Sequence, residues 1–274
     1  MRYLPREDAP ISERVWEMID GAALGAAKSQ LAGRRVLEIS GPYGFGYRAV
    51  DTAERPAGGE VTRGGATATL SSAQVQPIPM LSSGFTLPIR DIAAAEEHGV
   101  RLELKAAVDA AIATSHLEDK LIFEGNTGLG VAGLMTVAGA AKVKLGNWGD
   151  VGKAVDDLIA AVNALDSAGF PGPYTAALAP VLYNALFLRY PQSDMLQMEH
   201  AREVITGGIV KAPTLKSGGV VMQAGRHVAT IIVGQDLTVA YVGPSGTSYE
   251  FVVVESLAPR VFIPEAVCVL EAGK

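Results

Sequence analysis

Residues 33–44 constrain the fold of this chain most strongly, because they end a helix, contain a short strand and then break that strand. Apolar side chains recur at helical spacing over residues 12–32, and Gly33 is suited to end the predicted helix. Residues 35–40 alternate between two faces, which predicts a strand, and Gly41 and Pro42 then break it. The chain therefore begins with a helix that leads directly into a sheet.

The next segment is typical of a hairpin with few core residues. Strands are predicted at residues 47–53 and 66–75, joined by the glycine-rich residues 56–60. A lone two-stranded hairpin is only marginally stable in water, so we expect another element or another chain to pair with it or cover it. A disordered surface loop is the alternative interpretation.

Further along the chain, the hydrophobic pattern predicts a mixture of helices and strands. The predicted helices lie at residues 88–97, 102–124, 150–168, 180–188 and 195–205. The predicted strands lie at residues 174–179, 228–233, 237–242 and 249–255. A domain boundary is expected near residue 135, where the composition shifts toward short strands, glycine and alanine.

The composition favours an oligomer over a monomer. Hydrophobic residues make up 49% of the 274 residues and charged residues only 19%, with a mean hydropathy of +0.23, which favours extensive contacts between subunits. The net charge of −6 argues against a general nucleic-acid-binding role. The N-terminus lacks the apolar core of a signal peptide, and no uninterrupted apolar run reaches the roughly 18 residues of a membrane span. We therefore expect a soluble cytoplasmic protein with neither a nucleic-acid nor a membrane partner.

The residue pattern predicts no catalytic residue, cofactor site or metal site. None of the four histidines belongs to a metal-binding motif, and Cys268 is expected to be a buried strand thiol. The glycine motif at residues 128–133 follows a predicted helix, whereas a dinucleotide-binding motif follows a strand. The chain is nevertheless long enough to form a pocket, so a stand-alone soluble oligomeric enzyme, such as a hydrolase, is the alternative function.

Several short segments give the chain a resemblance to a known family. The segment at residues 33–44 is followed, in the family's order, by Phe85-Thr86-Leu87 and by residues 118–125, 133–136, 172–174 and 234–237. This series resembles the family 1 encapsulins, whose shell proteins have the fold of the HK97-type phage major capsid protein. The resemblance implies an α+β fold and a subunit that assembles into an icosahedral nanocompartment.

The resemblance also implies a domain division and a set of partners. A peripheral domain with the N-terminal helix is expected at residues 1–47, 75–134 and about 226–256, an extended loop at residues 48–74, and an axial domain at residues 135–225 and about 257–274. The implied partners are further copies of the chain and a cargo enzyme with a C-terminal targeting peptide. The implied cargo is a peroxidase or a ferritin-like protein of iron storage or oxidative stress.

Two sites follow from the resemblance alone. The groove for the cargo peptide maps onto Leu24, Ala27, Leu31, Arg34, Glu38, Asp236, Leu237 and Val239. In the alternative interpretation Leu31 and Leu237 are ordinary core residues and Arg34 pairs with Glu38. A pore loop at the five-fold axis maps onto Arg189, Tyr190, Pro191, Gln192, Ser193 and Asp194. Some members stack a flavin on a tryptophan just after the Phe-Thr-Leu segment, but Pro88 follows here, so no flavin is predicted.

Overall fold

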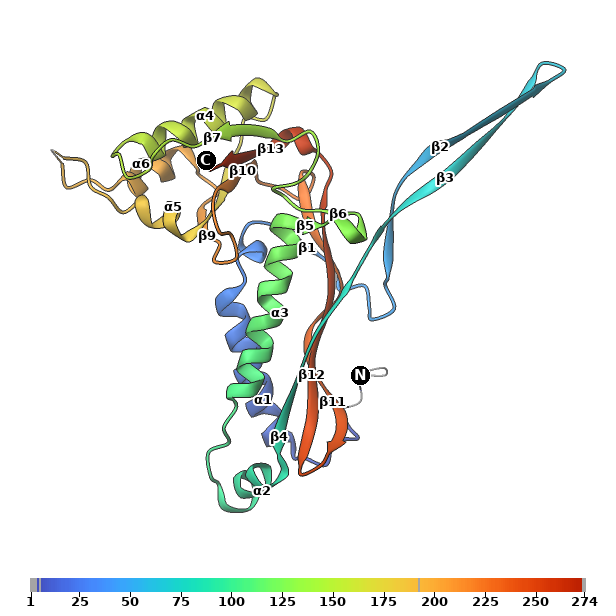
Figure 1. Cartoon of the computed structure of the whole chain (residues 1–274), viewed down its shortest axis with the longest axis vertical. Coiled ribbons are helices and arrows are strands. Elements are labelled where there is room, and N and C mark those ends of the chain that lie inside the picture. The colour runs from blue at the N-terminus through green and yellow to red at the C-terminus, as the bar shows by residue number, and fades with distance from the viewer. Residues whose placement is uncertain (1–3, 5, 192, 273–274) are drawn as a thin grey trace.

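Two β-sheets, a long central helix and a projecting two-stranded arm form the framework of the chain in this computed structural model (Figure 1). The structure describes residue 4 and residues 6–191 and 193–272. One sheet contains, in spatial order, β1 (Glu38–Ser40), β11 (Ala229–Ser245), β12 (Ser248–Val261) and β4 (Met80–Pro88). The other contains β7 (Ala141–Lys144), β13 (Val267–Glu271), β10 (Gly219–Gln223), β8 (Tyr174–Leu178) and β9 (Ile209–Lys211).

The helices and the remaining short elements connect and cover these sheets. The α-helices are α1 (Glu13–Gln30), α2 (Ile89–His98), α3 (Lys105–Glu124), α4 (Lys153–Ser167), α5 (Pro180–Ala185) and α6 (Gln197–Val204). The 3₁₀ turns are η1 (Gly33–Arg35), η2 (Thr127–Leu129) and η3 (Pro264–Ala266), and β5 (Gly125–Asn126) pairs with β6 (Val131–Ala132). Among the described residues, no helix is both long enough and apolar enough to span a membrane.

The N-terminal helix follows the prediction at its start and departs from it at its end. Ser12 caps α1, because its side chain accepts a hydrogen bond from the backbone N of Val15 at 3.4 Å. The helix ends at Gln30, so the prediction that Gly33 ends it is wrong. Gly33 lies instead in η1, where an added Cβ would come within 2.6 Å of the Ile122 side chain. This glycine is required for close packing on α3.

The predicted strand at residues 35–40 is shorter in the structure, since β1 contains only its last three residues. The predicted strands at 228–233 and 237–242 are one strand, β11, which pairs in parallel with β1 and antiparallel with β12. The pairing register shifts on both sides of Gln235. The segment Gly234-Gln235-Asp236, which interrupts the hydrophobic pattern, is therefore a bulge within a continuous strand.

The arm consists of β2 (Ala49–Arg63) and β3 (Ala66–Pro77), which project away from both sheets (Figure 1). The prediction placed its turn at residues 56–60, but those residues lie within β2, where the pairing register shifts. The turn is formed by Gly64 and Gly65, with φ values of +60° and +86°. Two residues with positive φ are typical of the tight turn that connects antiparallel strands, so the arm is longer than predicted.

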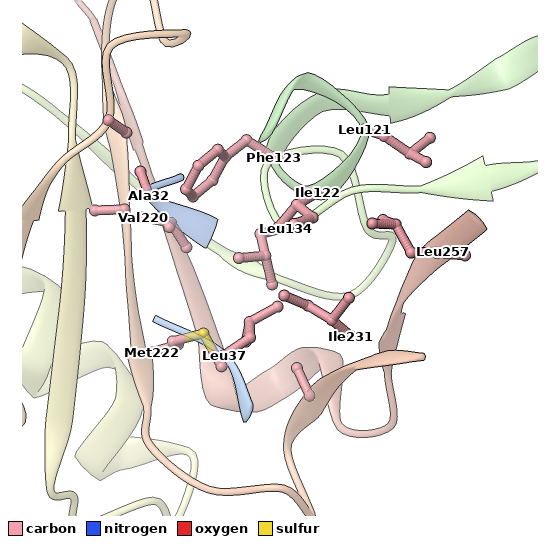
Figure 2. Close-up of a cluster of buried hydrophobic side chains, with 14 of the residues drawn as sticks. Ala32, Leu37, Leu121, Ile122, Phe123, Leu134, Val220, Met222, Ile231 and Leu257 are labelled. Carbon is pink, nitrogen blue, oxygen red and sulfur yellow. The ribbon is translucent and has the colours of Figure 1, made fainter. Parts of the chain in front are cut away.

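Both sheets share one hydrophobic core. The cluster in Figure 2 combines Leu37, the end of α3 at Phe123, Val220 of the five-stranded sheet, and Ile231 and Leu257 of the four-stranded sheet. A second core lies between the four-stranded sheet and helices α1, α2 and α3, and a third packs α4 and α6 on the five-stranded sheet. Cys268 is buried in this third core, in strand β13, as predicted.

The two main sheets draw on different predicted domains. The strands of the five-stranded sheet all lie within the predicted axial segments, and those of the four-stranded sheet lie within the predicted peripheral segments except for the last five residues of β12, 257–261. The division into peripheral and axial domains itself stays a prediction.

Gly99 ends α2 in the left-handed conformation, with φ +66°.

Candidate functional site

The candidate site is a cluster of charged side chains around Arg34, where the end of α1 meets α3, β11 and β12. The Nε of Arg34 donates to Oε1 of Glu118 at 2.8 Å, and its Nη2 donates to Oε2 of the same carboxylate at 3.2 Å. Nη1 donates to Oδ1 of Asp236 at 2.8 Å, and Nη2 also donates to Glu255. Four of the five N–H groups of the guanidinium are thus engaged within the chain.

Most of this cluster is shielded from water. The side chains of Glu118 and Glu255 are 0% exposed and that of Arg34 is 16% exposed, whereas that of Asp236 is 55% exposed. Buried charges are tolerated only when they are paired and hydrogen-bonded. Arg34 therefore serves first to hold two buried carboxyl groups in place, and one of its N–H groups has no partner among the described residues.

Asp119, the neighbour of Glu118 on α3, holds the backbone of the same segment. Its Oδ2 accepts from the amide of Ala32 at 2.9 Å, and its Oδ1 accepts from the amide of Gly33 at 2.8 Å. Helix α3 thus holds η1 at two points. Asp119 binds the backbone of this segment, and Glu118 binds the side chain of Arg34. The cluster fastens the end of the N-terminal helix to the centre of the molecule.

Burial and neighbouring charges shift the acid–base equilibria of these groups. Burial, together with the charge of Glu118, raises the pKa of Glu255 to about 9. Burial also raises the pKa of Asp119 to about 6, although the amides of Gly33 and Ala32 oppose the shift. For Arg34, burial acts to lower the pKa, but the hydrogen bond and charge of Glu118 outweigh it and the pKa is raised. At neutral pH, Glu255 is therefore protonated and Arg34 is charged.

The structure brings together only some of the residues predicted for the peptide groove. Arg34 and Asp236 are in direct contact. Ala27 and Val239, however, are 2% and 0% exposed and belong to the core beneath α1, so their predicted place in an open groove is wrong. Leu31 is 7% exposed, which agrees with the alternative of a core residue.

The remaining groove residues lie nearer the surface. Leu24 is half-buried on α1, and Leu237 is half-buried against the core that contains Val239. Glu38 is exposed, and its Oε2 lies 3.8 Å from Nε of Arg226. The alternative prediction that Arg34 pairs with Glu38 is wrong, because the guanidinium binds three other carboxyl groups.

An open hollow of about 420 Å³ lies beside the cluster. Its lining consists of residues 34–39 together with Ala224, Gly225 and Ala229. It therefore gathers Arg34 and Glu38, but none of the other predicted groove residues. This hollow therefore makes one part of the predicted site both concave and accessible.

The predicted pore loop forms a turn between α5 and α6 that projects from the body of the molecule (Figure 1). Nη1 of Arg189 lies 3.4 Å from Oδ1 of Asp194, and the amide of Ser193 donates to the carbonyl of Tyr190 at 3.1 Å. Pro191 is exposed, and Gln192 lies outside the described residues.

The ring of Tyr190 anchors this loop to α6. Its hydroxyl lies 3.0 Å from Nδ1 of His200, and the two ring centroids are 5.1 Å apart. Burial raises the pKa of Tyr190, with a smaller contribution from the charge of Asp156. The loop is therefore tied to the helix at its base, and its far side is open to solvent.

The two buried carboxyl groups that hold Arg34, those of Glu118 and Glu255, were missed by reasoning from the sequence. A weak signal existed, because Glu118 and Asp119 precede the apolar run Leu121-Ile122-Phe123, and Glu255 follows the apolar residues of β12. Acidic residues within buried stretches need partners. The sequence alone does not show that all of these partners converge on one arginine.

Comparisons with known proteins identify the family. A protein-family model described as "Encapsulating protein for peroxidase" matches residues 1–258. The type 1 encapsulin shell protein EncA of Myxococcus xanthus is 33% identical, over 99% of this chain and 97% of the relative. The match thus spans both sheets, the arm and the Arg34 cluster.

Solved structures agree on the fold. A virus-like particle from Pyrococcus furiosus matches with a TM-score of 0.74 and 23% identity, over 94% of this chain and 99% of the other. The capsid of the Myoviridae phage XM1 matches with a TM-score of 0.62 and 14% identity, over 88% and 90% of the two chains. The predicted α+β fold of the phage-capsid type is confirmed. The chain belongs to the encapsulin family of shell proteins.

Proposed function

We propose that copies of this chain assemble into a closed icosahedral shell that encloses a cargo enzyme in the cytoplasm. The observation that carries the proposal is the arm formed by β2 and β3. These strands form a sheet of their own, and Val61 and Leu70 in them are 70% and 61% exposed. An arm of this length with exposed apolar side chains needs a partner surface.

A neighbouring copy is the cover that this arm requires. A two-stranded hairpin has little stability alone, and its open edges favour association with another chain. In a symmetric assembly, each copy both offers an arm and receives one, so every arm finds a surface. This repeated contact supports a closed particle.

The proposed cargo is a peroxidase, following the description of the matching family, with a ferritin-like protein as the other expectation. We place capture of its C-terminal peptide at the hollow lined by Arg34 and Glu38, and we extend the proposed surface to Asp236, which contacts Arg34, and to the half-buried Leu24 and Leu237. The exposed carboxylate of Glu38 supports a charged hydrogen bond with the peptide. Arg34, which has one N–H group without a partner among the described residues, contributes at most one such bond.

The proposed route for small molecules is the loop at residues 189–194. A ring of such loops around a symmetry axis lines a pore whose width and charge select what passes. Arg189 and Asp194 are exposed there and carry opposite charges. We propose a structural role for the chain itself, with catalysis left to the enclosed enzyme. The family match favours this function over a stand-alone hydrolase.

Electron microscopy of the purified chain, combined with size-exclusion chromatography, tests the proposal. Hollow particles of uniform diameter, eluting far ahead of a 28.5 kDa monomer, are the expected result. A monomer or small oligomer at all concentrations would contradict it. Co-expression with a peroxidase that carries its own C-terminal peptide then tests cargo capture separately.

A further inference from the structure

Arg35 is a cationic side chain that lines the hollow beside η1 and has no partner among the described residues. The residue is exposed, and it forms neither a hydrogen bond nor an ion pair within the described part of the chain. Its neighbour Arg34, by contrast, donates to three carboxyl groups. A guanidinium keeps its charge at any pH that a protein meets, so an unpaired one in a hollow favours an anionic ligand.

The other charged groups beside the hollow already have partners of opposite charge. Oε2 of Glu38 lies 3.8 Å from Nε of Arg226, which follows Gly225 of the lining. Arg34 is paired with carboxyl groups from α3, β11 and β12. Within the described part of the chain, Arg35 is therefore the charged group of this hollow that is left to bind a ligand.

The rest of the lining is mainly apolar, and much of it consists of small residues. Ile39 is 39% exposed and Val36 is half-buried, and Ala224 and Ala229 lie on the same hollow. The volume of about 420 Å³ is near the lower end of the range of ligand pockets, which is roughly 300–1,000 Å³. A hollow of this size fits the end of a peptide, with one apolar side chain and one anionic group, better than a long segment.

We propose that this hollow recognises the terminal carboxylate of the cargo protein and that Arg35 is the residue that binds it. This role depends on the proposed capture of a C-terminal peptide and names the chemical group by which the peptide is read. Every C-terminal peptide carries this anion, and a guanidinium binds a carboxylate through two parallel hydrogen bonds. The apolar lining then holds the last side chain, and Glu38 accepts from a backbone amide further along the peptide.

Recognition of the terminus has a consequence for the choice of cargo. An acidic side chain within the peptide offers the same chemical group, but only a terminal carboxylate is displaced when residues are added after it. Cargo capture should therefore depend on where the cargo chain ends as well as on its sequence.

Co-expression of the shell protein with a peroxidase in three forms tests the proposal. The first form keeps its own C-terminus, the second carries Gly-Ser-Gly-Ser after its last residue, and the third lacks its C-terminal peptide. Quantitative gels of purified particles measure the loading of each form. The extension is expected to reduce loading roughly tenfold, because it removes a charged hydrogen bond while the peptide sequence stays intact. Removal of the peptide should abolish loading.

The Arg35→Gln variant of the shell protein completes a double-mutant cycle with the extended cargo. It should reduce loading of the unmodified form roughly tenfold and leave loading of the extended form unchanged, because that form no longer places a carboxylate at Arg35. Arg90→Gln, at an exposed position of α2, is the matched control and should load each form as the wild type does. Neither variant should change particle size on size-exclusion chromatography, since both side chains are exposed.

Three outcomes would contradict the proposal, and they are distinguishable. Equal loading of the unmodified and extended forms would overturn it, and a carboxylate from an acidic side chain within the peptide would give this result. Equal effects of Arg35→Gln on the two forms would remove Arg35 from the site. Equal loading of the unmodified and truncated forms would contradict capture of a C-terminal peptide itself.

Discussion

Gly33 shows at the scale of a residue why the N-terminal segment tolerates so little change. An added Cβ would lie 2.6 Å from Cδ1 and 3.1 Å from Cγ2 of Ile122, and 3.2 Å from Oδ1 of Asp119. Ile122 is 0% exposed and cannot move away without disturbing the shared core. The same position carries one of the two amides that Asp119 binds.

Substituting Gly33→Ala is expected to destabilise the fold by about 1–3 kcal/mol, because it overpacks the contact with α3. The matched control is Gly25→Ala on α1, where nothing lies within 4 Å of the added Cβ. That change is expected to stabilise the helix by roughly 0.5–1 kcal/mol. Calorimetric midpoints of the two variants measure both effects. Equal midpoints would show that the close contact of Gly33 with α3 does not affect the stability of the fold.

Asp119 makes stability depend on pH. Its pKa is about 6 in the folded chain, against an ordinary value of 3.8, so the folded state binds this proton more tightly than the unfolded state. Asp119 therefore contributes its full stabilisation of the folded state when the pH is below its ordinary pKa of 3.8. This contribution is lost as the pH rises through the folded pKa of about 6. A shift of about two units corresponds to about 3 kcal/mol.

The Asp119→Asn variant should remove this pH dependence, because an amide does not titrate. The advantage of the wild type over the variant in thermal midpoint is therefore expected to be larger at pH 4 than at pH 7. Because the two proteins share all other titrating groups, the contributions of those groups cancel in the difference between the two midpoints. A difference in midpoint that stays constant over this range would contradict the assigned shift.

At the scale of elements, the hollow beside η1 and β1 is the proposed docking surface for cargo. Glu38→Lys reverses a charge on its lining, where the side chain of Glu38 is 61% exposed. Loss of a charged hydrogen bond is expected to reduce cargo loading by roughly tenfold, while assembly is unaffected. Glu97→Lys, on an exposed position of α2, is the control. Quantitative gels of purified particles measure loading, and equal loading in both variants would move the docking surface elsewhere.

The loop between α5 and α6 has a different expected effect. Replacing Ser193 with Phe and Asp194 with Leu should slow entry of small substrates to an enclosed peroxidase, because bulky apolar groups narrow and dry a pore. Particle size should not change, since neither side chain is buried. Turnover of the enclosed enzyme, compared with that of the free enzyme, measures the effect. Unchanged turnover in intact particles would place the main entry route elsewhere.

Local signals predicted the elements well, whereas the connections between distant segments were not predictable. The helices predicted at residues 12–32 and 88–97 correspond to α1, which Ser12 caps, and to α2, which ends at Gly99, and both helix ends depend on short-range chemistry. The bulge at Gln235 was mistaken for a break, because a bulge and a turn both interrupt the hydrophobic pattern. The partners of Arg34 lie 84 and 221 residues away, at Glu118 and Glu255, and no spacing rule links them.

At the scale of the whole molecule, the arm is the part that the single chain does not explain. The rest of the described chain is organised around four buried hydrophobic clusters, whereas the tip of the arm projects from the body (Figure 1) and its apolar side chains are exposed. The cores account for the stability of one subunit. In the proposed assembly, the arm joins each subunit to its neighbours.

Mass photometry of an arm-shortened variant tests this role of the arm in assembly. Replacing residues 56–71 with Asn-Gly keeps the pairing of Arg55 with Ser72 and closes the hairpin with a two-residue turn. The full-length control replaces Gly64 with Asn and keeps Gly65, which preserves the tight turn. We expect folded small species from the shortened variant and intact particles from the control. Intact particles of unchanged mass from the shortened variant would contradict it.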